Sequence, residues 1–146
     1  MTELSYELNE LDYKIIELLR KNSRMTYQEM GKALGLSEGA IRRRVKKLIE
    51  KKIIKQFTIK VDLGQRVRAM SMISVSPGYS TPSVTEKLSK LEGVEEVYEV
   101  TGEYDAVAII AVRSVNELNK CIEDVRKTEG VRNTNTMIIL RVVETD

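Results

Sequence analysis

The stretch ALGLSEGAIRRRVKKLIEKK, residues 33–52, decides the fold of the N-terminal part of this chain. Gly35 suits the left-handed backbone conformation that ends a helix, and Ser37 suits the N-cap position that begins the next one. After this turn, apolar residues recur at three- and four-residue steps, which is typical of an amphipathic helix. We therefore expect one helix that ends near Gly35, a short turn, and a further helix over about residues 38–51.

The predicted helix over residues 38–51 has an apolar face and a basic face. At about 100° per residue, one side collects the apolar residues, which should be buried. These are Ile41, Val45, Leu48 and Ile49. The opposite side holds Gly39, Arg43, Lys46, Lys47 and Glu50, with Arg42 on the flank. Arg44 falls at the edge of the apolar stripe, so we expect its stem to be buried or its guanidinium to pair with a carboxylate.

Two further helices are predicted upstream of this stretch. Leucines and isoleucines at three- and four-residue steps indicate an amphipathic helix that ends at Asn22-Ser23. Thr26 followed by Glu29 is the signature of a capping box, which marks the start of a second, short helix. The residues of this second helix that should face inward are Met30, Ala33 and Leu34.

A short helix, a glycine-containing turn and a basic helix form a helix-turn-helix candidate. In that motif the last helix enters the major groove of DNA with its N-terminal part leading. The two helices must cross closely, and Gly31 supplies a small residue for the crossing. Arginine suits bidentate contact with guanine, and arginine and lysine both suit phosphates. The candidate DNA-binding residues are Ser37, Gly39, Arg42, Arg43, Lys46 and Lys47.

The charge distribution favours double-stranded DNA as the partner of this half. Between Arg42 and Lys55, eight basic residues accompany one acidic residue, Glu50. Solubility does not need such a single-sign bias, and like charges three or four residues apart destabilise a helix. Residues 1–60 contain fourteen Lys/Arg and eight Asp/Glu, a net charge of +6, whereas residues 61–146 contain ten and fourteen, a net charge of −4. The alternative is a three-helix domain for protein contacts, with a basic face that serves only solubility.

The apolar period changes from helical to strand-like after residue 52. Residues 53–61 predict an extended strand and residues 62–68 a connection. The elements predicted after them are strand 69–75, helix 83–91, strand 94–101, strand 106–112, helix 115–127 and strand 131–143. The order β-α-β-β-α-β predicts a ferredoxin-like α+β sandwich with a four-stranded antiparallel sheet. The expected organisation is a helix-turn-helix domain over 1–52, a linking strand and connection over 53–68, and the sandwich over 69–146.

The composition limits the chemistry that the chain can perform. It has no histidine and one cysteine, Cys121, which removes Cys/His zinc sites, the Ser-His-Asp triad, the Cys-His dyad and an internal disulfide. We therefore expect no catalytic residue, no metal site, no cofactor and no enzyme activity. Neither a membrane span nor a signal peptide is visible. These features together favour a cytoplasmic protein.

Residues 11–57 resemble the N-terminal domain of the Lrp/AsnC family, the feast/famine regulators of bacteria and archaea. The residues that carry the resemblance are Leu11-Asp12, Asn22 with Arg24, Leu34 to Ser37, and Arg44-Val45 with Leu48. The sequence departs from the family pattern at two positions. Gly31 stands where alanine is usual, and Lys52 replaces the glycine commonly found before the strand, which leaves the exact exit from the last helix open.

The resemblance continues to the end of the chain, where residues 96–105 (EVYEVTGEYD) and 133–140 (NTNTMIIL) look like parts of the family's amino-acid-sensing RAM domain. It implies that a free amino acid binds there, where dimers pack together. The candidate ligand-binding residues are Thr101, Gly102, Glu103, Tyr104, Asp105, Thr134 and Thr136. Gly102 would let the backbone approach a ligand, and the two threonine hydroxyls share one strand face. Glu103 or Asp105 could receive an ammonium group, which weakly favours lysine or arginine.

The resemblance implies a sequence-specific transcriptional regulator whose DNA affinity or assembly is modulated by an amino-acid effector between RAM domains. The strand over 53–61 and the open face of the sheet would pair two chains into a homodimer, with tetramers or octamers above it. One alternative is an effector-independent autoregulatory or architectural DNA-binding protein, because the ligand residues also suit a tight hairpin and an ordinary strand. A second is an enzyme or an enzyme-regulatory subunit, in which the basic helix would have no task.

Overall fold

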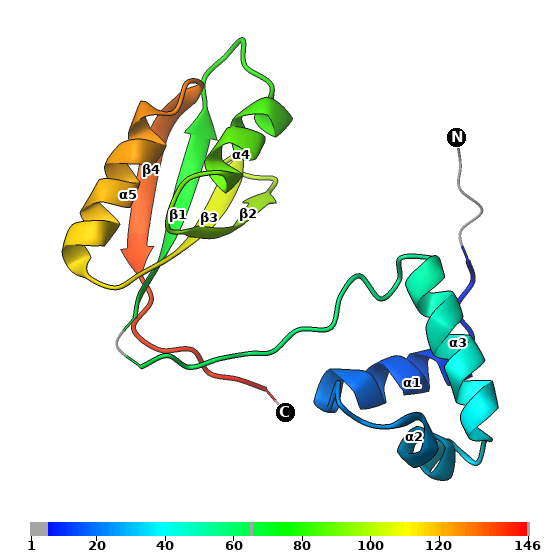
Figure 1. The fold of residues 1–146 in the computed structure, drawn as a ribbon. Helices are drawn as coiled ribbons and strands as arrows, with labels where there is room; N and C mark the ends of the chain where they lie inside the picture. Colours follow the sequence, from blue (N-terminus) through cyan, green and yellow to red (C-terminus); the bar gives the residue numbers. More distant parts are fainter. Residues whose placement is uncertain (1–5, 65, 146) are drawn as a thin grey trace. The chain divides into compact units, whose positions relative to one another are not determined.

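The computed structural model describes residues 6–64 and 66–145, and it divides into two compact units between Val61 and Asp62 (Figure 1). The described part of the N-terminal unit contains α1 (Glu10–Lys21), α2 (Tyr27–Leu34) and α3 (Glu38–Glu50). The C-terminal unit contains β1 (Val67–Val75), α4 (Thr81–Ser89), β2 (Val94–Glu99), β3 (Ala106–Val112), α5 (Val115–Lys127) and β4 (Val131–Ile138). The helix-turn-helix order and the βαββαβ order are both confirmed.

Local side-chain caps fix the start of α2 and the turn between α2 and α3, as the sequence predicts. The Thr26 hydroxyl accepts a hydrogen bond from the backbone N–H of Glu29, and the Glu29 carboxylate accepts one from the N–H of Thr26 at 2.8 Å. Gly35 ends α2 in the left-handed region with φ 69°. Ser37 then begins α3 by accepting from the N–H of Ala40 at 3.2 Å. The capping box, the C-cap glycine and the N-cap serine are thus all confirmed.

The core of the N-terminal unit is formed by five buried side chains from the three helices. They are Ile15, Met30, Ile41, Val45 and Leu48. The predicted burial is wrong for two residues: Ile49 is 44% exposed, and Ala33 is also exposed. The reason is geometric. At about 100° per residue, Ile49 lies about 80° around the helix from Ile41, and Ala33 lies on the side of α2 away from buried Gly31.

The C-terminal unit is a single antiparallel sheet in the order β2-β3-β1-β4 with helices packed on one face. Alternate residues of the two central strands point to that face and are buried against α4 and α5. This cluster contains Ile73, Ala106, Ala108, Val84, Leu88 and Val125. The arrangement confirms the predicted α+β sandwich.

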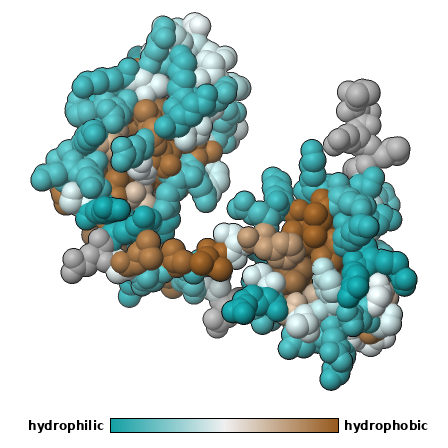
Figure 2. Space-filling model, viewed as in Figure 1, coloured by the Kyte–Doolittle hydropathy of each residue, from teal (hydrophilic) through white to brown (hydrophobic). Residues whose placement is uncertain are grey.

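The other face of the sheet is apolar at its centre and polar toward its edge strands, and it carries no helix of the described chain. Met70 lies across from Ile109, and Met72 lies across from Val107, on the side opposite the buried residues of β1. Tyr98, which pairs with Val107, is 50% exposed. Figure 2 shows hydrophobic surface on each of the two units. An apolar sheet face of this kind is a surface that can be buried against a partner.

Several element boundaries differ from the predicted ones. In the described chain, the ladder hydrogen bonds join only the strands β1, β2, β3 and β4, so the predicted strand over 53–61 is not formed in the single chain. A strand exists only where a neighbour completes its hydrogen bonds, and alternating hydrophobicity cannot supply that neighbour. For the same reason β4 ends at Ile138 rather than at 143, and β2 ends at Glu99 rather than at 101. β1 begins earlier, at Val67, and α4 spans Thr81–Ser89 rather than 83–91.

The exit from α3 passes through a residue in an unusual conformation. Lys52 has φ 56°, and it is the only non-glycine residue with positive φ in the part of the chain that the structure describes. Left-handed backbone brings the Cβ atom of an L-residue close to the following carbonyl, which glycine avoids. The lysine that departs from the family pattern therefore occupies a position at which glycine is less strained.

Substitutions at the two helix ends should have opposite effects on stability. Gly35→Ala should lower the free energy of unfolding by about 1 kcal/mol, because alanine resists positive φ. No atom lies within 4 Å of a Cβ at Gly35, so this loss would report backbone strain alone. Lys52→Gly should raise the free energy of unfolding by up to about 1 kcal/mol. Urea unfolding of the full chain measures both, and an equal loss from the two substitutions would contradict this account.

Candidate nucleic-acid interface and effector site

The outer face of α3 presents all six predicted DNA-binding residues to solvent. Ser37, Gly39, Arg42, Arg43, Lys46 and Lys47 are each exposed, whereas Ile41, Val45 and Leu48 on the inner face are buried. The helix is therefore anchored along one side and free along the other. A recognition helix needs this arrangement if it is to enter a major groove while it stays packed in the domain.

The exposed basic residues of α3 differ in what they contact. Arg42 pairs with Glu38 at 2.5 Å, and its guanidinium carbon lies 5.6 Å from the centre of the Tyr27 ring. Lys46 lies 4.0 Å from Glu50. Arg43 forms no ion pair with any residue that the structure describes. It is therefore the arginine most available for contact with a phosphate or a base.

Arg44 has a structural role, as the sequence predicts. Its Nη1 atom lies 3.1 Å from Oδ1 of Asp12 and 3.2 Å from Oδ1 of Asn9. Asp12 is fully buried, and its Oδ2 atom also accepts from the Tyr6 hydroxyl and the Asn9 N–H, both at 3.1 Å. A buried carboxylate needs this many donors to offset its lost hydration. The ion pair therefore ties α3 to the start of α1.

The crossing of α2 and α3 depends on the absence of a side chain at Gly31. A Cβ atom placed there would lie 2.5 Å from the carbonyl oxygen of Leu36. The turn accordingly packs directly against the backbone of α2. This confirms the expected use of a small residue at the crossing.

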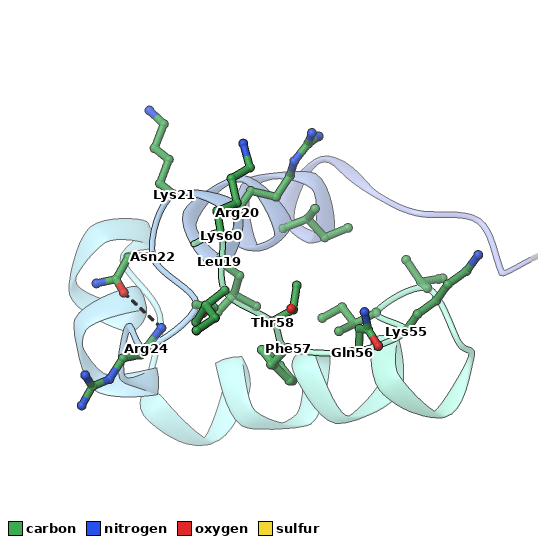
Figure 3. Close-up of a pocket in the computed structure, with 15 residues that line it drawn as sticks. Leu19, Arg20, Lys21, Asn22, Arg24, Lys55, Gln56, Phe57, Thr58 and Lys60 are labelled. Atoms are coloured by element: carbon green, nitrogen blue, oxygen red, sulfur yellow. Dashed lines mark hydrogen bonds between the residues drawn. The ribbon is translucent and has the colours of Figure 1, made fainter. Parts of the chain in front are cut away.

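A pocket in the N-terminal unit lies between the end of α1 and the extended segment that follows α3 (Figure 3). Leu19 lines it from α1, and Phe57 and Thr58 line it from the extended segment. At its edge, the side chain of Asn22 accepts a hydrogen bond from the N–H of Arg24 at 3.0 Å, which turns the chain between α1 and α2. The six residues of the basic face of α3 do not line this pocket. It is therefore separate from the candidate DNA-binding surface.

In the C-terminal unit, the strand register brings the two predicted ligand-binding pieces to the same end of the sheet. Ile73 of β1 pairs with Ala106 on one side and with Thr134 on the other. The loop over 100–105 and the start of β4 therefore flank the C-terminal end of β1. Within that loop Thr101, Gly102 and Glu103 are exposed, and Gly102 has φ 113°.

Asp105 already has a structural partner within the chain. Its Oδ2 atom accepts a hydrogen bond from the backbone N–H of Val75 at 2.7 Å, and its own N–H donates to the carbonyl oxygen of Ile73 at 2.9 Å. The side chain thus holds the loop to the end of β1. Glu103, in contrast, forms no ion pair with the described residues, so it is the freer of the two acidic groups.

The two threonines of β4 are also engaged, each with a partner that the sequence did not identify. Thr136 shares a hydrogen bond with buried Ser71 at 3.0 Å. Thr134 accepts from Nε of Arg126, on α5, at 3.4 Å. Tyr104 accepts from the side-chain amide of Asn135 at 3.3 Å. No local pattern predicts these contacts, because each one joins elements that meet only through the sheet register or the packing of α5.

Three further observations concern metal ligands, the single cysteine and membrane-spanning helices. Residues 6–64 and 66–145 contain no group of His, Cys, Asp and Glu that could hold a metal ion. Burial, and secondarily the charge of Asp124, raises the pKa of the Cys121 thiol, so this cysteine is a poor nucleophile. Within the same ranges no helix is long and apolar enough to cross a bilayer.

These features define a class of protein, a helix-turn-helix unit with a basic outer face followed by an α+β sandwich. Comparison with protein families agrees with it. Residues 8–49 match the AsnC-type helix-turn-helix domain, and residues 68–146 match the Lrp/AsnC ligand binding domain. The chain therefore belongs to the Lrp/AsnC family and is a transcriptional regulator of that type.

Relatives of known name and structure cover almost the whole chain. The HTH-type transcriptional regulator LysM of Sulfurisphaera tokodaii is 43% identical over 136 residues, which are 93% of this chain and 97% of the relative. E. coli AsnC, whose structure is solved, is 31% identical in sequence with a TM-score of 0.82. The match covers 97% of this chain and 99% of the AsnC chain. A feast or famine regulatory protein of M. tuberculosis, solved in complex with L-methionine, is 27% identical with a TM-score of 0.83, and covers 96% of this chain and 97% of its own.

The neighbouring arginines of α3 should contribute unequally to stability. Arg44→Ala should lower the free energy of unfolding by about 2 kcal/mol, because it leaves the buried Asp12 carboxylate without its cation. Arg43→Ala should change it by less than about 0.5 kcal/mol, since Arg43 is exposed. Chemical unfolding followed by helical circular dichroism measures both values. Equal losses would show that the Asp12–Arg44 pair does not anchor α3.

Proposed function

We propose that this regulator binds double-stranded DNA through the outer face of α3. The single observation that carries the proposal is the exposure of a basic face on a helix whose opposite face is anchored in the core. The proposed contact residues are Ser37, Gly39, Arg42, Arg43, Lys46 and Lys47. Ser37 and Gly39 lie at the leading end of α3, where short side chains permit close approach to base edges. The basic residues that follow suit phosphates and guanine.

We further propose that two chains act together on DNA as a homodimer. Two apolar surfaces support this: the open sheet face around Met70 and Met72, and the extended segment after α3. In that segment Phe57 is 52% exposed, Ile59 77% and Val61 59%, at alternate positions as on one face of a strand. Antiparallel pairing of this segment with the same segment of a second chain would supply the strand hydrogen bonds that residues 53–61 lack in the single chain. A dimer places two recognition helices in successive major grooves, about 34 Å apart.

The proposed contacts predict the salt dependence of DNA binding. Lys46→Ala should weaken binding to the DNA upstream of the protein's own gene, because one phosphate is then no longer neutralised. The slope of log K against log salt should fall by about one for each such phosphate. Arg43→Ala should weaken binding more on that DNA than on a random duplex if it reads a base. Fluorescence anisotropy at several salt concentrations measures both effects.

Lys14→Ala provides the matched control for these variants. Lys14 lies on α1, where it pairs with Glu10 at 2.9 Å, and its removal should leave affinity and slope unchanged. Unchanged affinity and slope in both α3 variants would overturn the assignment of α3 as the DNA-binding surface. If the wild-type protein bound neither the upstream DNA nor the random duplex, the proposed DNA-binding function itself would be wrong.

We propose that a free amino acid is the effector and that it binds at the end of the sheet. The proposed residues are Thr101, Gly102, Glu103, Tyr104, Asp105, Thr134 and Thr136. Support comes from their convergence around β1 and from the similar M. tuberculosis protein, which was solved with L-methionine. The free carboxylate of Glu103 favours a basic amino acid such as lysine or arginine. Binding between dimers would then favour one assembly, a tetramer or an octamer, over another.

The effector proposal predicts a selective calorimetric response. Titration against the twenty amino acids should give binding of lysine or arginine, and Glu103→Gln should reduce that binding about tenfold because it removes a charge-assisted hydrogen bond. Asn133→Ala, on the strand next to the threonines, is the control. Light scattering should show a change of assembly with the bound amino acid. Because coupling is reciprocal and typically about 1–3 kcal/mol, DNA should alter the amino-acid affinity by the same factor.

A uniformly silent panel would favour an effector-independent regulator over the proposed one. Tight binding of an apolar amino acid would keep the effector and remove the role of Glu103. We propose no enzymatic activity, since the relatives are named as transcriptional regulators. We propose a cytoplasmic location because the DNA partner is found there.

A further inference from the structure

Tyr6, in the segment before α1, contacts a lysine on the exposed face of α3. Tyr6, three residues before the N-cap Asn9, lies with its ring centre 4.7 Å from the ammonium nitrogen of Lys47. Its hydroxyl donates to Oδ2 of Asp12 at 3.1 Å. One side chain thus connects the buried carboxylate that anchors α3 with a lysine on the exposed face of α3.

The tyrosine is held from several directions. Asp12 is fully buried and is itself fixed by Arg44 and by the N–H of Asn9. Burial, followed by the hydrogen bond to Asp12, raises the pKa of the Tyr6 phenol above its ordinary value of 10.0, so the hydroxyl remains a donor throughout the neutral range. Arg44 and Lys47 are three residues apart on α3 and so share one side of the helix. Arg44 contacts the Asp12 carboxylate to which Tyr6 also donates, and Lys47 contacts the ring of Tyr6.

A lysine placed over an aromatic face is attracted by the ring quadrupole. Lys47 is exposed, and a free lysine side chain of this length samples many rotamers, which binding would have to restrict. The ring of Tyr6 removes part of that freedom in advance. The ammonium can still approach a phosphate, since the ring covers one side of the lysine head.

We propose that Tyr6 is a positioning residue of the DNA-binding surface, which holds Lys47 in place on α3 so that less conformational freedom is given up when DNA binds. This inference rests on the proposed DNA-binding function. It extends the surface to a residue outside the helix-turn-helix itself. The aromatic ring makes the contact that holds Lys47, and the hydrogen bond from the hydroxyl to Asp12 orients the ring.

The test compares Tyr6→Leu and Tyr6→Phe in the full-length protein. Both substitutions remove the hydrogen bond to Asp12, but only leucine removes the ring. A cation–π contact at an exposed site is worth about two- to fivefold in affinity. Tyr6→Leu should therefore weaken binding to the upstream DNA about two- to fivefold, and Tyr6→Phe should recover most of that loss. In a Lys47→Met background, Tyr6→Leu should have no further effect.

Tyr13→Leu is the matched control, because Tyr13 is an exposed tyrosine on α1, 57% accessible, with no ring contact to α3. Thermal unfolding of each variant separates a folding defect from a binding defect. Equal weakening by leucine and phenylalanine, unchanged affinity in Tyr6→Leu, or a loss that persists without Lys47 would each overturn the proposal. If DNA binding responds to Arg43→Ala but not to Tyr6→Leu, this inference alone fails. If the wild-type protein does not bind DNA, the proposed function fails with it.

Discussion

The buried carboxylate of Asp12 is the constraint on which the N-terminal unit depends. An ionised group with no exposure to water is stable only where donors surround it, and here Arg44, Tyr6 and the N–H of Asn9 do so. Two of these donors lie in the segment before α1 and the third lies in α3. The carboxylate therefore fixes the angle at which α3 sits on α1, and with it the direction in which the basic face points.

This anchoring explains why three consecutive arginines take three different roles. Rotation of about 100° per residue turns Arg44 toward Asp12, Arg43 toward solvent and Arg42 toward Glu38 and Tyr27. The basic run in the sequence is consequently not one uniform cationic surface. Charge that anchors the helix is directed inward, and only the remainder is available to a polyanion. If all the basic side chains of α3 pointed to solvent, the helix would lack the Arg44–Asp12 ion pair that orients it.

The features that the sequence predicted correctly are those decided within a few residues. The caps at Thr26 and Ser37, the turn at Gly35 and the position of Arg44 at the edge of the apolar stripe follow from local geometry and helical periodicity. The partner of Arg44, the carboxylate of Asp12, lies 32 residues away and was not identified from the sequence. The failures have a common origin in longer-range packing. Whether residues 53–61 form a strand depends on a partner strand. Ile49, about 80° around α3 from Ile41, lies at the edge of the apolar stripe, and the packing of the three helices leaves it 44% exposed. The candidate effector residues were identified by resemblance, whereas Ser71 and Arg126 beside them required the sheet register and the packing of α5.

In the C-terminal unit, a single strand connects the proposed effector loop with the proposed dimer face. Asp105 holds the loop to the backbone of Val75 and Ile73 at the end of β1. Further along the same strand, Met70 and Met72 project onto the open face of the sheet. A displacement of the loop on binding an amino acid would therefore act directly on the strand that carries the apolar surface. Because packed strands have few alternative arrangements, such a shift would favour one mode of chain association over another rather than grade smoothly between them.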